Sequence, residues 1–183
     1  MLEADIIAHC APTLAGIKTA NMFTYISENG DSICQEVDEI NGKLNSRDVY
    51  VEILRQSEKR ALIYVYRKTM LENDLSSEGA CALLKNCGYE CKETTCCIRK
   101  LQKKIFEDEY FPHEIGVFLG YPLDDVIGFI EQQGKNYKCC GIWKVYGDEQ
   151  QSQMLFRKLK KCSEIYKRLF ANGRTLLQLT VAA

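Results

Sequence analysis

The sequence predicts a mixed α/β protein, with a sheet of about five strands and helices on the faces of that sheet. Two β-rich runs, 49–54 and 61–67, are joined by a polar link and predict an antiparallel hairpin. The last third of the chain reads strand, helix, strand, helix, strand, which is typical of parallel βαβαβ crossovers. We therefore expect a single α/β domain over 1–183, with a helical N-terminal segment, 1–47, packed on it.

Two helices are expected in the N-terminal segment. Residues 2–9 form the first, which should end before Ala11 because the residue ahead of Pro12 avoids the helical region. Asp31 or Ser32 can cap the second. The apolar side chains of that second helix recur every three or four residues, at Ile33, Val37, Ile40 and Leu44.

Residues 68–108 are predicted to be helical in pieces. Ser76 and Ser77 interrupt the first piece, and Gly88 stands where the end of a helix favours glycine. The apolar stripe of the next piece consists of Ile98, Leu101 and Ile105.

The stretch 112–129 is expected to hold the central strand and to begin the helix after it. Residues 114–119 alternate like a strand, which would bury Ile115, Val117 and Leu119 on one face. Gly116 and Gly120 leave the other face bare, so that a packed helix or a ligand approaches the backbone closely there.

The following helix should begin at Pro122 and end at Gly134, with Asp124 and Asp125 in its first turn, where the helix dipole favours carboxylates. A strand at 137–146, a helix from Asp148 to about Ala171 and a closing strand at 176–181 complete the prediction. If the residues between them are extended, His113 lies about 20 Å from Tyr121, too far for one pocket to hold both.

Charge and hydropathy exclude two classes of protein. Lys and Arg number 24 against 25 Asp and Glu, which argues against nucleic-acid binding. No apolar run approaches the roughly 20 residues of a membrane span, and the acidic N-terminus does not read as a signal peptide. These features predict a soluble, cytoplasmic protein.

The ten cysteines are expected to be reduced, since disulfides are rare in the cytoplasm and a chain of this length needs none to fold. The cluster Cys87, Cys91, Cys96 and Cys97 lacks the paired spacing of a zinc knuckle. We therefore predict no metal site in this cluster.

Three motifs carry a resemblance: H-C-A-P-T-L-A-G-I-K at 9–18, P-H-E-I-G-V-F-L-G-Y-P-L-D-D-V at 112–126 and G-I-W-K-V-Y at 141–146. Over nearly its whole length the chain resembles a family of uncharacterised bacterial proteins, a domain of unknown function found mostly in anaerobic Gram-positive bacteria. The resemblance implies no activity. It implies only which residues to test, namely His9, Cys10, Lys18, His113, Glu114, Gly120, Tyr121, Asp125, Trp143 and Lys144.

The function predicted is the binding of a small ligand, in a pocket formed by the N-terminal His-Cys motif and the His-Glu-Ile-Gly strand. Free N–H groups after Gly120 and after Gly147, with charge from Lys18 or Lys144, could receive an anion, although Asp124 and Asp125 already occupy the first of these helix termini and argue against a phosphate there. The ligand-binding candidates are His9, Lys18, Asn21, Gly116, Gly120, Tyr121, Asp125, Trp143 and Lys144. The sequence does not decide whether the protein is an enzyme or which cofactor, if any, it uses.

Two alternatives remain beside ligand binding. Cys10 could be a nucleophile with His113 as its base and with Glu114 or an aspartate orienting the imidazole. Alternatively, His9, Cys10 and His113, with or without Glu114, could bind zinc or iron. An interaction protein, including a homo-oligomer, could instead use a sheet face that bears tyrosines, Tyr50, Tyr64 and Tyr66.

Overall fold

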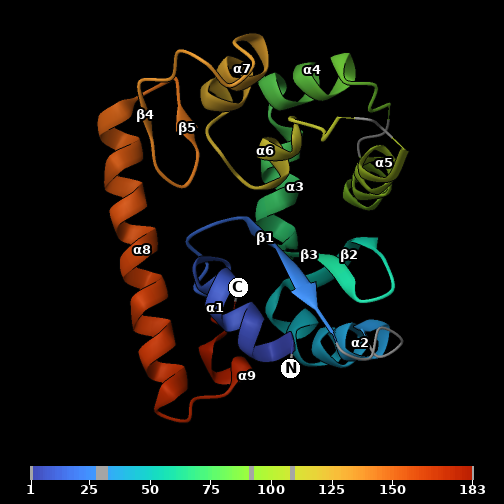
Figure 1. Cartoon of the computed structure of the whole chain (residues 1–183), viewed down its shortest axis with the longest axis vertical. Coiled ribbons are helices and arrows are strands. Elements are labelled where there is room, and N and C mark those ends of the chain that lie inside the picture. Colours follow the sequence, from blue (N-terminus) through green and yellow to red (C-terminus); the bar gives the residue numbers. More distant parts are fainter. Residues whose placement is uncertain (1, 28–32, 91–92, 108–109, 183) are drawn as a thin grey trace. The chain divides into compact units, whose positions relative to one another are not determined.

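The computed structural model describes residues 2–27, 33–90, 93–107 and 110–182 (Figure 1). The chain divides into two compact units, one made of Met1–Thr69 with Lys161–Ala183 and the other of Met70–Lys160. A compact unit need not fold by itself, so the expectation of one domain over 1–183 stays a prediction. The expected caps Asp31 and Ser32 lie outside the described residues.

The first unit contains a three-stranded antiparallel sheet in the order β1-β3-β2. Its strands are β1 (Ala20–Ile26), β2 (Val49–Gln56) and β3 (Arg60–Arg67), and a 3-10 turn, η2 (Asn45–Arg47), precedes β2. The predicted hairpin is confirmed as β2 and β3. β1 was not predicted because its buried and exposed residues alternate only over its last few positions, from Phe23 onward.

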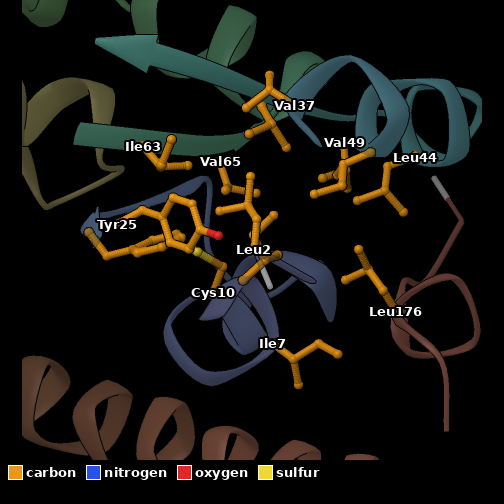
Figure 2. Packing of buried hydrophobic residues seen from close by; sticks show 14 of the residues in the cluster. Leu2, Ile7, Cys10, Tyr25, Val37, Leu44, Val49, Ile63, Val65 and Leu176 are labelled. Carbon is orange, nitrogen blue, oxygen red and sulfur yellow. The ribbon is translucent and has the colours of Figure 1, made fainter. Parts of the chain in front are cut away.

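Helices α1 (Leu2–Leu14), α2 (Ile33–Leu44) and α9 (Leu176–Leu179) share the core of this unit with the sheet. Figure 2 shows Val37 and Leu44 of α2 in this core together with Val65 of β3. The predicted inward face of α2 is confirmed, since all four of its apolar residues are buried: Ile33, Val37, Ile40 and Leu44.

The prediction that the first helix ends before Ala11 is wrong, since α1 continues through Pro12 to Leu14. A proline disfavours the helical region at the residue before it but does not forbid it. Gly16 terminates the helix two residues after Leu14, since its φ of +71° is the left-handed conformation that glycine adopts without strain. Ile17 N–H donates to the Pro12 carbonyl at 3.0 Å and Gly16 N–H to the Thr13 carbonyl at 3.1 Å, the pair of bonds of a Schellman motif.

Arg67, at the end of β3, is buried and joins three segments of the first unit. Its Nε donates to the Thr13 carbonyl and its Nη2 to the carbonyls of Leu14 and Val181, each at 2.7 Å. The guanidinium therefore satisfies backbone acceptors at the end of α1, where a helix leaves carbonyls without partners. Burial lowers the pKa of this guanidinium from its usual value.

β2 is an edge strand of the sheet, and α2 covers part of its open side. The side chain of Asn41 donates to the Val51 carbonyl at 2.9 Å and accepts from the Val51 N–H at 2.8 Å. One side-chain amide thus pairs with both backbone groups of Val51, as a neighbouring strand would.

The second unit is mostly helical, and the predicted helical pieces at 68–108 are confirmed over the described residues. α3 (Lys68–Ser76) and α4 (Glu78–Asn86) meet at the predicted serine break, and Gly88 takes a φ of +83° after α4. α5 (Thr94–Glu107) buries its expected stripe, Ile98, Leu101 and Ile105. The longest described helix, α8 (Glu149–Ala171), begins after Asp148, whose side chain accepts from the Gln151 N–H at 3.0 Å.

Three predicted strands are wrong. Residues 114–119 contain the helical turn α6 (Ile115–Phe118), and 176–181 contain α9, which a capping box of Thr175 and Gln178 starts. Within 137–146 the chain forms a small antiparallel hairpin instead of one strand, with β4 (Cys139–Cys140) paired to β5 (Lys144–Val145).

The mixed helix and strand class is therefore right, while the sheet is smaller than expected. The described residues form one three-stranded and one two-stranded sheet, both antiparallel, in place of a sheet of about five strands with parallel crossovers. Among the described helices, none combines the length and the apolar composition needed to cross a membrane.

Candidate functional site

A cavity of about 300 Å³ lies within the second unit, and we call it the α6–α7 pocket. α7 (Leu123–Glu131), the turns around α6 and the loop between β4 and β5 line it. Six of the residues singled out from the sequence are in its wall: His113, Gly116, Tyr121, Asp125, Trp143 and Lys144. Their role in binding stays a prediction.

The helical turn of α6 explains how one cavity holds both ends of the central motif. A helix rises 1.5 Å per residue and a strand about 3.3 Å, so the same residues span less than half the distance. The Tyr121 N–H donates to the Gly116 carbonyl at 3.0 Å, which folds the chain back after α6. The expectation that His113 and Tyr121 are too far apart for one pocket is therefore wrong.

Gly116 is the point where α6 and α7 approach closely. A Cβ added at Gly116 would lie 2.7 Å from Cγ2 of Val126, closer than carbon atoms pack. Of the two approaches predicted for this glycine, a packed helix or a ligand, the structure has the packed helix. Gly120 serves the turn after α6, with a φ of +67°, and is not among the residues that line the cavity.

Asp125 joins α7 to the hairpin on the other side of the cavity. Only 2% of this residue is exposed, and its carboxylate accepts three hydrogen bonds. Trp143 Nε1 donates to one oxygen, and the N–H groups of Tyr146 and Gly147 donate to the other, each at 2.7 Å. These donors and the first turn of α7 compensate the buried charge.

Aromatic rings form much of the cavity wall. The Trp143 ring stacks on Tyr121 with centroids 4.6 Å apart, and Phe156 meets the same indole edge-on at 4.5 Å. Phe129 contacts the His113 ring at 4.9 Å. Burial raises the pKa of the Tyr121 hydroxyl, so this phenol remains protonated at neutral pH.

Lys144 supplies a cation in the wall. Its Nζ donates to the Gly134 carbonyl at 2.7 Å and lies 5.7 Å from the centroid of the Phe129 ring and 4.9 Å from that of Tyr137. An ammonium has three N–H donors, so this contact leaves donors for a ligand.

Glu114 is turned to a different set of partners. Its carboxylate pairs with Lys104 and accepts from the Tyr89 hydroxyl at 3.3 Å. Glu114 is not among the cavity residues, and desolvation followed by this carboxylate raises the pKa of Tyr89. The contacts of Glu114 therefore do not support its predicted role of orienting His113.

The N-terminal candidates His9, Cys10, Lys18 and Asn21 belong to the first unit. Cys10 of α1 is fully buried in the core of the first unit (Figure 2), and His9 is exposed and stacks on Phe23 with ring centroids 5.0 Å apart. Lys18 donates to the Ala20 carbonyl, and Asn21 accepts from the Thr13 hydroxyl at 2.8 Å. Burial raises the pKa of the Cys10 thiol, opposite to the direction that an activated nucleophile needs.

Six residues of the cavity wall were not among the candidates: Ile115, Val126, Phe129, Cys140, Gly141 and Ile142. Phe129 could have been found from its place one helical turn after Asp125 on α7, which directs both side chains to one face. Cys140 ends β4 and Ile142 lies in the turn after it, both within the stretch predicted to be one continuous strand. Ile142 belongs to the motif at 141–146, whereas no signal marked Cys140.

The described cysteines are free thiols except Cys96, which is disulfide-bonded. The prediction of reduced cysteines throughout is therefore wrong at Cys96. Within the described ranges, no group of three or more His, Cys, Asp and Glu side chains is arranged to hold a metal ion.

A family model described as "Protein of unknown function (DUF3793)" matches residues 6–180. The chain belongs to this family. The resemblance inferred from the three motifs is thereby confirmed at the level of the family, and the DUF3793 match includes every residue of the α6–α7 pocket. No curated protein and no solved structure matches the chain.

Proposed function

We propose that the protein binds a small, planar, largely apolar molecule in the α6–α7 pocket. The observation that carries this proposal is the convergence of three aromatic side chains, Tyr121, Phe129 and Trp143, on one cavity of about 300 Å³. Small-molecule sites are typically concave and apolar, with a few polar groups that fix the orientation of the ligand.

The polar groups of the cavity have the arrangement expected of such a site. Asp125 anchors the indole of Trp143 through the hydrogen bond at Nε1, so this ring is held in place before a ligand arrives. Rigid aromatic walls lower the ordering entropy that binding costs. His113 is exposed at the cavity, where it can offer or accept a hydrogen bond.

The Cys-His alternative has less support in the form that uses Cys10. A buried thiol with a raised pKa is a poor nucleophile. The carboxylate of Glu114 contacts Lys104 and Tyr89, and these contacts do not orient His113. Cys140 is the thiol that shares a cavity with His113. A homo-oligomer through an exposed sheet face that bears tyrosines also has less support, because Tyr64 and Tyr66 are buried.

The indole N–H resonance of Trp143 offers a direct test, because the chain has one tryptophan. Titration with 2-naphthylmethanol, a neutral two-ring probe, should shift this resonance and saturate. Phe129→Ala removes one aromatic wall and should weaken binding about tenfold, in line with the energy of an aromatic contact.

Phe106→Ala is the matched control, since Phe106 is 73% exposed on α5 and does not line the cavity. This variant should bind the probe like the wild-type protein, and circular dichroism should show that both variants are folded. A Trp143 resonance that does not move at any probe concentration, or equal affinities in the two variants, would contradict the proposal.

A further inference from the structure

The charged groups of the α6–α7 pocket differ in how far their charge is already compensated. Three N–H donors and the first turn of α7 surround the Asp125 carboxylate. With the residues that the structure describes, the Lys144 ammonium forms one hydrogen bond, to the neutral carbonyl of Gly134. Among the ion pairs that the described residues form, none includes Lys144.

We propose that the ligand of this pocket is an anion, a planar aromatic or heteroaromatic carboxylate whose charged group is received by Lys144. This inference rests on the proposed function and names the chemical class of its ligand. The free donors of an ammonium form strong, short hydrogen bonds to a carboxylate, and a partly buried site strengthens them.

The geometry holds Lys144 where it can serve this role. Its Nζ is attached to the Gly134 carbonyl at 2.7 Å and lies near the rings of Phe129 and Tyr137, so its position is fixed on several sides. The ring of Phe129 also contacts His113. The cation and the imidazole thus share one aromatic neighbour in the wall, while Trp143 and Tyr121 supply a stacked surface for the planar body of the ligand.

A cationic ligand is the competing reading, because aromatic walls also attract quaternary ammonium groups. Here the rings of Phe129 and Tyr137 already have a cation beside them, Lys144. A second positive charge in the cavity would meet repulsion from that ammonium. The Asp125 carboxylate, which could offset it, is engaged by its three donors.

Three probes with the same ring system and different charge separate these readings: 2-naphthoate, neutral 2-naphthylmethanol and the cation (2-naphthylmethyl)trimethylammonium. Titration of the full-length protein, followed by the Trp143 indole resonance, should give the tightest binding for 2-naphthoate, about tenfold tighter than for the alcohol. The cation should bind most weakly.

Lys144→Met keeps the length of the side chain and removes its charge. We expect 2-naphthoate to lose about tenfold in affinity in this variant, while 2-naphthylmethanol keeps its wild-type affinity. Lys135→Met is the matched control, because Lys135 is an exposed lysine nearby in the chain that does not line the cavity. It should leave both affinities unchanged.

The outcomes distinguish this inference from the function on which it rests. If the alcohol binds as tightly as the acid, if the cation binds best, or if Lys144→Met leaves the affinity for 2-naphthoate intact, the anion inference is wrong and the pocket remains a ligand site. If none of the three probes shifts the Trp143 resonance, both the anion inference and the proposed function are wrong. Should Lys144→Met fail to fold, the order of the three probes on the wild-type protein still decides.

Discussion

Asp125 is the residue on which the geometry of the candidate site depends most. Its carboxylate connects the first turn of α7 with Trp143, Tyr146 and Gly147 of the hairpin segment. Sequence reasoning placed Asp125 in a helix's first turn, where the helix dipole favours a carboxylate, and named it as a ligand-binding candidate. Its larger role, as the acceptor for a buried indole, depends on a contact across 18 residues that no local pattern reveals.

Asp125→Asn should destabilise the protein by about 2–3 kcal/mol. An amide has one acceptor oxygen in place of two, so its NH₂ group would face at least one of the N–H donors that the carboxylate now accepts. Urea unfolding measures the loss. Asp124→Asn is the control, since Asp124 is exposed in the same turn, and a similar loss in both variants would contradict this account.

The buried thiol of Cys10 makes the stability of the protein depend on pH. An exposed thiol has a pKa of 9.0, and burial raises that of Cys10, so above pH 9 the unfolded chain loses this proton while the folded chain keeps it. Ionisation lowers the free energy of the unfolded state alone, and the stability present below pH 9 declines as the pH rises.

Cys10→Ala should therefore flatten the alkaline decline in the free energy of unfolding by up to about 1.4 kcal/mol per pH unit. Chemical denaturation at several pH values above neutrality measures the slope. Cys34→Ala removes an exposed thiol and should leave the slope as it is in the wild type. Parallel slopes for wild type and Cys10→Ala would refute the argument.

At the scale of elements, α6 shows where periodicity fails as a guide. All four residues of α6 are buried: Ile115, Gly116, Val117 and Phe118. Without an exposed polar position, the sequence does not distinguish the alternating pattern of a strand from a helical turn. α2 and α5 were predicted correctly because each has an exposed face that sets the period. The predicted strand at 176–181 failed for a different reason: Leu176 and Leu179, three residues apart, are buried while Leu177 is exposed, and the capping box at Thr175 decides for a helix.

Gly116→Val should destabilise the protein by about 1–3 kcal/mol, because even its Cβ would overlap Val126 of α7. Thermal or urea unfolding tests this. Gly42→Ala in α2 is the matched control: a Cβ there meets nothing within 4 Å, and alanine favours the helix, so this variant should be neutral or slightly more stable. Combining Gly116→Ala with Val126→Ala should recover part of the loss that Gly116→Ala causes alone.

At the scale of the whole molecule, the two ends of the chain belong to one unit. α9 places Leu176 and Leu179 in the same core as Leu2 and Ile6 of α1, and the Val181 N–H donates to the Leu14 carbonyl at 2.9 Å. The candidate site, in contrast, is formed within 113–144. The sequence motifs identified most of the charged and aromatic residues of this site. The cavity itself is formed by the turns around α6, which could not be predicted from the motifs.

Leu176→Ala should cost about 2–5 kcal/mol of stability, because this side chain is buried in the core that joins the chain ends. Its neighbour Leu177 is 39% exposed on α9, and Leu177→Ala should change stability by less than about 0.5 kcal/mol. Urea unfolding of the two variants gives the comparison. Equal losses would show that α9 is not fixed to the core in the register described.

The contact between Asn41 and Val51 has a consequence for the behaviour of the protein at high concentration. An edge strand with unpaired N–H and C=O groups is a template on which a strand of another molecule can add, and such additions propagate into fibrous aggregates. The Asn41 amide already occupies both groups of Val51 in the middle of β2. A foreign strand would have to displace this side chain before it could extend the sheet, so one asparagine on a covering helix protects the molecule against self-association along that edge.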